Sequence, residues 1–508
     1  MKNKNKVKLL TTATLLTTFL INTGIQSSNQ IENNTARAAT NKKKTKPSGQ
    51  KPKGKLGKKM GTPPSGKKPS GKPGQKPNGK SGKGGPNTQS YDYKGTLKAS
   101  LNVKSGTTKV GKKTITNNKT DQNVALVQKN GKLSLDGTKL KKTGNSKNDD
   151  NANFYGLDSI LLADGKNATL TSKATGANGI FATNKGTVNV SNTKIKTTGK
   201  ANSRCLDATY GGKINANKVK ISTKGDHSAA VATDRGGGTV IVKNAKVTTK
   251  GTGSPLAYST GTINFNNVTG TASGSQIAGM EGYNKISLVN SDLTSTNNKI
   301  SGSDPIKNGV IIYQSTSGDA ETSSSKSADF QAKDSTLKTA ITSGAMFYVT
   351  NTTGKITLEN TKLNFNNSKV DLLNVAGNNS NGWGTKGKNG GHVTLTAKNQ
   401  TLKGNIVVDS ISSANVKLTD DSTYTGKTSI VANKYATSSS KSKMPLAISV
   451  GSNSKWIVTG NSTVTNLADG GEIVDSQGNK VTIIANGKTV QKGTSSYAVT
   501  VKGSFTTN

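Results

Sequence analysis

A short pattern of apolar and polar positions recurs through residues 178–293. Each copy contains an apolar–x–apolar triplet, then a small or polar turn, then a second short apolar stretch. The triplets begin at Val188, Ile214, Val240, Ile263 and Ile286, so they are 26, 26, 23 and 23 residues apart (214−188, 240−214, 263−240 and 286−263). A repeat of this length with short strands and no helical periodicity predicts a solenoid.

The triplets also predict which side chains face the core. Side chains alternate along a strand, so the middle residue of each triplet should point to solvent. It is polar in every triplet except one, where Ile241 occupies the position. Either Ile241 is an exposed apolar residue, or that copy is shifted by one residue. Asparagines that follow the triplets, such as Asn192 and Asn244, predict tight turns because Asn tolerates a left-handed backbone.

Each copy supplies an apolar approach strand and two further strands, which makes three faces. Equivalent strands that stack in parallel give an all-β, right-handed parallel β-helix solenoid, with rungs about 4.8 Å apart. Polar segments at 294–307 and 315–328 interrupt the period, and Gly/Asn-rich or Ser/Lys-rich segments at 378–391 and 434–444 do the same later. We expect these four segments to be loops on the side of the rod.

The chain divides into four parts. Residues 1–38 have the features of a secretory signal peptide: a lysine-rich start, an apolar stretch and the small-x-small site Ala36-Arg37-Ala38. A membrane anchor is the weaker alternative, because Leu9–Ile21 is shorter than the roughly 20 residues that span a bilayer. Residues 39–88 are predicted to be a disordered tether, 89–121 an N-terminal cap region, and 122–508 the β-helix with a C-terminal cap.

The tether carries much of the formal charge of +45. Residues 40–88 contain 15 lysines, no acidic residue and eight of the 11 prolines. Such a segment cannot bury an apolar face, so it should stay extended and solvated. It would either bind anionic cell-wall polymers such as teichoic acids or act only as a charged spacer. Nucleic acid is a poor partner for the chain, because lysines are not gathered with aromatic residues and the chain is predicted to be exported.

Hydrophobic residues make up 30% of the chain and aromatic residues 4%, which predicts a core one side chain thick. The chain has one cysteine, Cys205, so no internal disulfide can form. Cys205 is expected to be a buried apolar residue rather than a reactive thiol. No cofactor is expected, and no metal-ligand set is apparent, since His227 and His392 are the only histidines.

Three segments resemble bacterial secreted right-handed parallel β-helix proteins of the pectin-lyase-like class: 206–212 (LDATYGG), 227–238 (HSAAVATDRGGG) and 348–353 (YVTNTT). The resemblance covers roughly residues 120–500 and extends to bacterial surface proteins of the adhesin type. It implies a rod that grips extended polysaccharides. Some members of the class cleave their polysaccharide and many only bind, so the resemblance leaves the reaction open.

Aligning the copies stacks polar turn residues into one predicted column: Asp164, Lys185, Tyr210, Asp234, Thr260 and Gln314-Ser315. Arg235 and Glu281 should lie beside it, and Asp207 on an adjoining face. Acids on neighbouring or alternate rungs could act as general acid and base, which makes Asp207, Asp234 and Glu281 the catalytic candidates. The candidate ligand-binding residues, which offer a charge, an amide or an aromatic ring, are Arg204, Tyr210, Arg235, Tyr258, Tyr313 and Gln314.

Other interpretations of the same residues stay open. Asp, Asn and Thr also end strands and bind turn backbones, which requires no ligand. The pairs Asp149-Asp150 and Asp420-Asp421 are expected to be solvated turn residues, and Gly236-Gly237-Gly238 a tight corner. Trp383 is either an exposed sugar-stacking residue or part of a lid over the side of the rod.

These observations predict a secreted, envelope-associated, adhesin-like surface protein. A β-helix face would bind glycans, and the tether would hold the protein to the wall. The alternative function is a polysaccharide lyase or glycoside hydrolase with its groove along the β-helix. A structural rod without a specific ligand is the third possibility.

Overall fold

The computed structural model describes residues 89–161, 164–166, 169–172, 174–320, 327–379 and 383–507. The signal peptide and the disordered tether predicted for residues 1–88 lie outside the described residues. The described residues belong to one compact unit, Gly79–Asn508. They are dominated by strands, and their helices are α1 (Asp149–Tyr155) and the 3-10 turn η1 (Ser438–Ser440).

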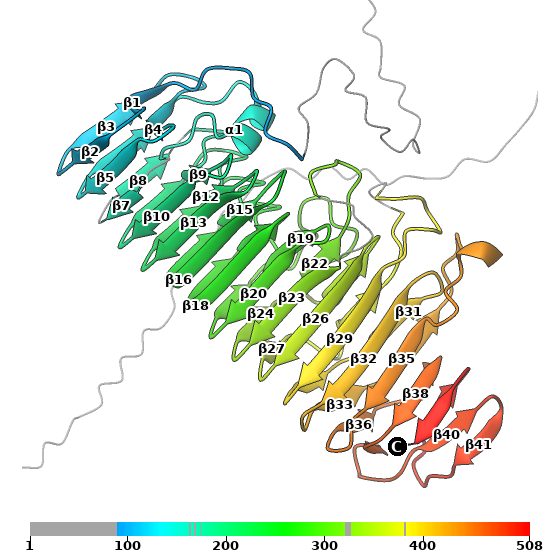
Figure 1. Ribbon diagram of the computed structural model, residues 1–508. Coiled ribbons are helices and arrows are strands. Elements are labelled where there is room, and N and C mark those ends of the chain that lie inside the picture. Colours follow the sequence, from blue (N-terminus) through cyan, green and yellow to red (C-terminus); the bar gives the residue numbers. More distant parts are fainter. Residues whose placement is uncertain are drawn as a thin grey trace, which may run out of the picture. The chain divides into compact units, whose positions relative to one another are not determined.

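Parallel strands from successive copies stack into three faces along a rod (Figure 1). The ten-stranded sheet is called face A. Its strands are β9 (Ile180–Ala182), β12 (Leu206–Ala208), β15 (Val231–Thr233), β17 (Ala257–Ser259), β19 (Ala278–Glu281), β22 (Asn308–Tyr313), β25 (Ala345–Thr350), β28 (Asp371–Val375), β31 (Ile406–Asp409) and β34 (Thr428–Val431). The pair β1 (Ala99–Val103) and β4 (Asn123–Val127) connects to face A through bridges at Leu161.

The second strand of each copy forms face B. Its strands are β2 (Thr107–Val110), β5 (Lys132–Asp136), β7 (Asp164–Lys166), β10 (Thr187–Ser191), β13 (Gly212–Asn217), the first half of β16 (Gly238–Thr249), the first half of β18 (Thr262–Ala272), β20 (Lys285–Val289), β23 (Ala328–Lys333), β26 (Thr353–Glu359), β29 (His392–Lys398), β32 (Ser413–Thr419), β35 (Leu446–Val450), β38 (Asn466–Asp469) and β43 (Phe505–Thr507).

The third strand of each copy forms face C. It contains the second halves of β16 and β18, together with β3 (Thr114–Asn117), β6 (Lys139–Lys142), β8 (Thr169–Ser172), β11 (Lys194–Thr197), β14 (Lys220–Thr223), β21 (Asp292–Ser295), β24 (Thr336–Thr339) and β27 (Lys362–Asn364). A separate sheet follows it, with β30 (Thr401–Lys403), β33 (Thr423–Gly426), β36 (Lys455–Val458) and β39 (Glu472–Val474). The predicted all-β parallel β-helix is therefore confirmed.

The register of face B matches the sequence repeat. Val188 pairs with Ile214, which pairs with Val240, and the ladder continues to Ile263 and Ile286. All five side chains are buried. Ile241 pairs with Asn215 and Asn264 in the outward column and is half-buried, so its copy is in register and the alternative of a shifted rung is wrong.

The main core is one apolar cluster that extends through the rungs, and two smaller clusters lie apart from it. Polar ladders satisfy the backbone at its corners. Before face A, Ser203 N–H donates to Ser228 Oγ, and Ser228 N–H donates to Ser254 Oγ, at 2.9 Å each. Between faces B and C, Asn244 and Asn267 have φ near +50°, and Asn267 Nδ2 donates to Asn244 Oδ1 at 2.7 Å. The predicted asparagine turns are thus confirmed at these corners.

The C-terminal end departs from parallel pairing. Strand β40 (Thr482–Ala485) pairs antiparallel with β41 (Lys488–Gln491) and parallel with β42 (Ala498–Val501), which pairs with β37 (Ser462–Val464). A hairpin at the end of a solenoid covers strand edges that would otherwise be open to another chain.

The structure also tests the predicted turns. Asp149-Asp150 is exposed, as predicted, but it is not a turn: both residues are in the first turn of the helix α1, where Asn148 Oδ1 accepts the N–H of Asn151 and caps the helix. Acidic residues suit this position because the helix N-terminus carries partial positive charge. Asp420-Asp421 is a turn with positive φ at both residues, and Gly236 and Gly237 form a tight corner before β16, as predicted.

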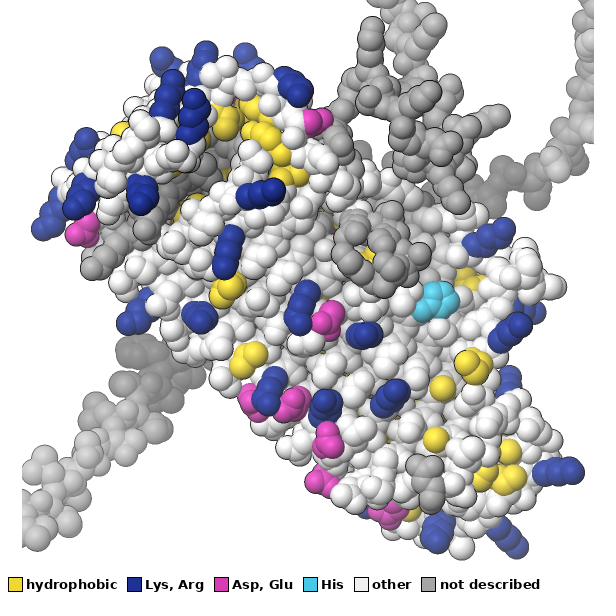
Figure 2. All heavy atoms as spheres, viewed as in Figure 1, with side chains coloured by type: hydrophobic (Ala, Val, Ile, Leu, Met, Phe, Trp, Pro, Cys, Tyr) yellow, Lys and Arg dark blue, Asp and Glu magenta, His cyan; other side chains and the backbone are white. Residues whose placement is uncertain are grey.

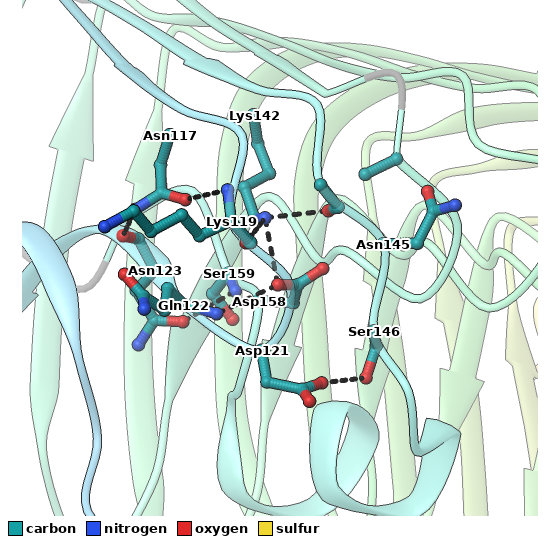
Figure 3. Close-up of polar contacts among 12 residues, drawn as sticks. Asn117, Lys119, Asp121, Gln122, Asn123, Lys142, Asn145, Ser146, Asp158 and Ser159 are labelled. Carbon is teal, nitrogen blue, oxygen red and sulfur yellow. Dashed lines mark hydrogen bonds and ion pairs between the residues drawn. The ribbon is translucent and has the colours of Figure 1, made fainter.

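A charged pair lies inside the N-terminal rungs (Figure 3). Lys142 Nζ lies 2.9 Å from Asp158 Oδ1, and both side chains are fully buried. The same ammonium group donates to the carbonyl oxygens of Lys119 and Gly144 at 2.7 Å each. Asp158 Oδ1 also accepts the N–H of Gln122. The pair therefore ties β6 to the segments on both sides of it.

Candidate functional site on face A

The outer side of face A carries most of the predicted site residues. Its middle column runs from Asp207 through Ala232, Tyr258 and Gly279 to Ile311, one residue per rung. Asp207, predicted for an adjoining face, is on face A itself. Loops leave the rod on this side near β19 and β22, as Figure 1 shows.

Arg204 joins two rungs of this face. Its Nη1 lies 2.9 Å from Asp207 Oδ2 and 2.7 Å from Asp234 Oδ2. Asp207 is fully buried and Asp234 nearly so, so both carboxylates are removed from water and compensated by one guanidinium group. The strand spacing brings the two acids together, because Asp207 belongs to β12 and Asp234 directly follows β15, its neighbour in the sheet.

Burial dominates the electrostatics of this triad. Desolvation raises the pKa of Asp207 to about 7, although the positive charge of Arg204 opposes the shift. Desolvation also raises the pKa of Asp234. Burial disfavours the charge on Arg204, but the carboxylates of Asp207 and Asp234 outweigh it and raise its pKa. Arg204 therefore stays charged, and its single positive charge is shared by the carboxyl groups of Asp207 and Asp234.

Glu281 is the centre of a second polar cluster. Its carboxylate accepts the hydroxyl hydrogens of Tyr258 at 2.7 Å and Tyr313 at 3.1 Å. Ser315 and Ser317 donate to its other oxygen. Burial raises the pKa of Glu281 and raises the pKa values of Tyr258 and Tyr313 well above that of free tyrosine. The four donors hold the carboxylate in place and leave it little freedom to bind another group.

A cavity of about 180 Å³ lies next to both clusters. Arg204, Tyr258 and Tyr313 form part of its wall. The rest comes from the turn at 227–229, from 253–255, from the outward residues of 276–279, and from the loop at 301–304. The loop and the turn touch closely: a Cβ added at Gly253 would lie 2.8 Å from His227 Nδ1 and 3.6 Å from Gly302 Cα. Two glycines with positive φ permit this approach.

Several polar groups on the cavity wall have hydrogen-bonding capacity left. Only Nη1 of Arg204 makes an ion pair, and Gln276 Nε2 has no hydrogen-bond partner among the described residues, although its Oε1 accepts from Ser275. Asp304 accepts a bond from Asn308 through Oδ2 at 2.8 Å, and burial raises its pKa to about 7. Donors, an acceptor and two aromatic rings thus converge on one space, as in sites that bind polyhydroxylated ligands.

The predicted column of turn residues was wrong at Tyr210. Tyr210 aligns with Arg235 through the bond from its N–H to the Arg235 carbonyl, and Asp234 aligns with Thr209 and Thr260. The register of face A is the reason: Ala208 pairs with Thr233, 25 residues further on (233−208), so Thr209 and not Tyr210 lies beside Asp234. Asp164, also in that column, lies in β7, where the structure describes no side chains.

Three of the candidate ligand-binding residues lie outside the cavity. Tyr210 is buried in an aromatic cluster, where it stacks on Tyr155 with ring centroids 5.7 Å apart. Arg235 pairs with Asp319 at 2.6 Å and lies over the ring of Phe154. The Gln314 side chain bonds its neighbour's carbonyl.

The structure shows the surroundings of Trp383 and Cys205, and both side chains are buried. Trp383 is 8% exposed and stacks on Tyr313 with ring centroids 4.3 Å apart, so it is part of a loop that covers the side of the rod. Cys205 is fully buried, and desolvation raises the pKa of its thiol to about 11, which confirms the prediction of an unreactive core residue. His392 is exposed at the start of β29, and His227 is an exposed turn residue on the cavity rim.

The polar cavity residues that sequence reasoning missed are Gln276, Ser301, Ser303 and Asp304. The interruption of the period at 294–307 marked the loop, but its fold over face A depends on contacts far apart in the sequence. Within the described parts of the chain, no cluster of three or more His, Cys, Asp or Glu side chains is placed to hold a metal ion. No helix among the described residues is long and apolar enough to cross a membrane.

Comparison with known proteins gave no match to a family model, a curated protein or a solved structure.

Proposed function

We propose that this protein is a secreted, adhesin-like surface protein that binds a glycan through the cavity on face A. The observation that carries the proposal is the set of polar groups in that cavity that lack a hydrogen-bond partner. Nε–H and Nη2–H of Arg204, Nε2 of Gln276 and Oδ1 of Asp304 have no partner among the described residues. Tyr258 and Tyr313 add aromatic surface, on which the apolar face of a sugar ring can pack.

The size and charge of the cavity favour one class of ligand. A volume of about 180 Å³ suits a single sugar unit at the end or side of a glycan rather than a long stretch of polysaccharide. Arg204 is already compensated by Asp207 and Asp234, and Asp304 adds a further acid. A neutral or amino sugar therefore fits better than a uronate, whose carboxylate would need an uncompensated cation.

The acids support binding more than catalysis. None of the three candidate acids lines the cavity. Asp207 and Asp234 form ion pairs with Arg204, and Glu281 accepts hydrogen bonds from four hydroxyl groups. A general acid or base must reach the bond that breaks. A lyase or glycoside hydrolase stays the alternative, with Asp304 as the acid nearest to a bound sugar.

A glycan-array screen of the full chain at physiological salt tests the proposal, with mass spectrometry of each incubated hit. We expect binding without cleavage. Gly279→Leu should abolish the binding, because Gly279 lines the cavity and a leucine side chain would fill it. The backbone should tolerate the change, since a Cβ at this position lies 3.6 Å or more from its neighbours, which is an ordinary contact distance. Gly279→Ala should weaken it less. The matched control is Ser287→Leu, in the outward column of face B.

Two results would contradict the proposal. Binding that survives in Gly279→Leu would place the glycan elsewhere, and shortened or unsaturated products would identify an enzyme. Envelope attachment is tested separately: if residues 40–88 bind anionic wall polymers, washing cells with high salt should release the protein, because screening weakens exposed charge pairs. Retention at high salt would refute that anchor.

A further inference from the structure

Three lysines stack directly on one another on face C. Lys194 of β11 pairs in register with Lys220 of β14, which pairs with Lys246 of β16. Their side chains are exposed and, in a parallel stack, lie about 4.8 Å apart. Three further exposed lysines flank this column on the same rungs; the whole set, here called the lysine ladder, is Lys194, Lys196, Lys218, Lys220, Lys243 and Lys246.

Elsewhere on the rod, exposed lysines are stacked on acidic residues of the next rung and form ion pairs with them. Lys285 pairs with Asp329 at 3.1 Å, and Lys333 with Glu359 at 2.5 Å, each directly opposite in register. Figure 2 shows acidic side chains beside basic ones over this part of the surface. The lysine ladder differs, because none of its members makes an ion pair with any described residue.

Structure alone does not require this concentration of charge. Further along the same column the positions are Thr269, Asp292 and Thr336, which are neutral or acidic and fit the same strand. Like charges one rung apart repel each other, so the ladder costs stability that a threonine would not. A bound anionic partner would offset the repulsion, because each lysine would then be attracted to a negative charge of the partner.

The shape beside the ladder defines what such a partner can be. A shallow groove of about 590 Å³ follows the corner between faces B and C. Its lining includes the corner residues of four successive rungs, Asn192, Lys218, Asn244 and Asn267, together with Lys194, Lys220 and Lys246. The groove thus extends along the rod axis, and no aromatic or arginine side chain lines it.

We propose that the lysine ladder binds a linear polyol phosphate polymer laid along this groove. Compact ammonium groups recognise phosphate as point charges, and a row of them along the axis suits a chain that carries a charge on every unit. The amides of Asn267, Asn244 and Asn217 already bond one another along the corner, and the second hydrogen of each amide nitrogen can donate to a polyol hydroxyl. A single-stranded nucleic acid is disfavoured, because the groove offers no ring on which bases could stack. This site is on another face than the glycan cavity and does not depend on the proposed function.

Residue-resolved footprinting tests the proposal in the full chain. Lysines are acetylated briefly with and without poly(glycerol phosphate), and mass spectrometry reports each site. We expect several-fold protection of Lys194, Lys220 and Lys246, and no protection of Lys355 and Lys398, which are exposed on face B. Because each lysine is read separately, binding by residues 40–88 does not obscure the result.

A charge-matched pair of variants supplies the second readout. Lys194→Gln/Lys220→Gln/Lys246→Gln should lower the slope of log affinity against log salt by about 2, since three phosphate contacts are lost. Lys355→Gln/Lys398→Gln/Lys417→Gln changes net charge equally and should leave the slope unchanged. Equal protection of all lysines, or equal slopes for the two variants, would overturn the site. Protection by heparin or single-stranded DNA but not by the polyol phosphate would overturn the assigned partner.

Discussion

Lys142 Nζ and Asp158 Oδ1 lie 2.9 Å apart inside the rod, with both side chains fully removed from solvent (Figure 3). Burial lowers the pKa of Lys142 and raises that of Asp158 to about 7, and the attraction between the two opposes both shifts. A buried pair of this kind contributes little net stability compared with an apolar pair, but it is costly to break, since the remaining charge stays buried.

Removing one partner should therefore destabilise the N-terminal rungs. We expect Asp158→Ala to cost about 3–5 kcal/mol, because the ammonium group of Lys142 loses its carboxylate. Hydrogen exchange should accelerate in β4, β5 and β6, and thermal unfolding monitored by circular dichroism should begin at a lower temperature. Asp292→Ala, at an exposed position of face C, removes the same charge and should change little.

The double variant Lys142→Met/Asp158→Leu separates two explanations. If the cost comes from the unpaired charge, the double variant should recover most of the lost stability, because apolar side chains replace both ions. A double variant as unstable as Asp158→Ala would show that the hydrogen bonds of Lys142 to Lys119 and Gly144 carry the stabilisation instead.

Acidification should stabilise the protein. Asp207 has a folded pKa of about 7, raised by burial above the ordinary value of 3.8, so between these values the folded state holds a proton that the unfolded state has lost. This contribution is fully present below about pH 4 and disappears as pH rises through about 7, with a slope of up to about 1.4 kcal/mol per pH unit. Melting temperatures should therefore be higher at pH 5 than at pH 8.

Asp207→Asn provides the control for that pH dependence. The amide does not titrate, so the variant should show a smaller difference between its melting temperatures at pH 5 and pH 8. An unchanged difference would mean that other buried acids, such as Asp158 or Asp304, carry the effect.

The serine ladder should be sensitive to loss of a single hydroxyl. Ser228 Oγ accepts the buried N–H of Ser203 and donates to the carbonyl of Asp226, at 2.9 Å each. Ser228→Ala leaves both groups without this partner and should cost about 1–3 kcal/mol. The measurement is urea unfolding alongside Ser222→Ala, a half-buried outward position on face C that should be nearly neutral. Equal effects would refute a special role for the ladder.

Trp383 should hold its loop against the rod. Its ring stacks on Tyr313 and its carbonyl accepts the amides of Asn378 and Asn389. Trp383→Ala removes a buried aromatic ring, a change that costs about 3–5 kcal/mol in well-packed sites. We expect faster hydrogen exchange at residues 383–391 with little change in β9 to β16. The exposed Val431 provides a control as Val431→Ala, and equal exchange in both variants would contradict the stacking role.

The candidate site was only partly predictable. The parallel register of face A places successive rungs side by side and so brings six of the candidates together. They are Arg204, Asp207, Asp234, Tyr258, Glu281 and Tyr313. Tyr210 was assigned to the same column as Asp234, which is wrong, because Thr209 lies beside Asp234. Face A advances by 25 residues between these rungs (233−208) and face B by 26 (238−212), so a single repeat length does not define the alignment of the turns.

The solenoid, its inward triplets and its asparagine corners could be predicted from the sequence, because they depend on local alternation and turn preference repeated many times. Which buried charges are compensated, and by which partner, depends on the tertiary fold. Alternation with Leu140 turns Lys142 toward the inside of the rod, but the carboxylate of Asp158 that compensates it comes from a distant segment. Likewise, Asp304 reaches the cavity because its loop folds back over face A. Such contacts depend on loop lengths and on packing between distant segments, which no local pattern records.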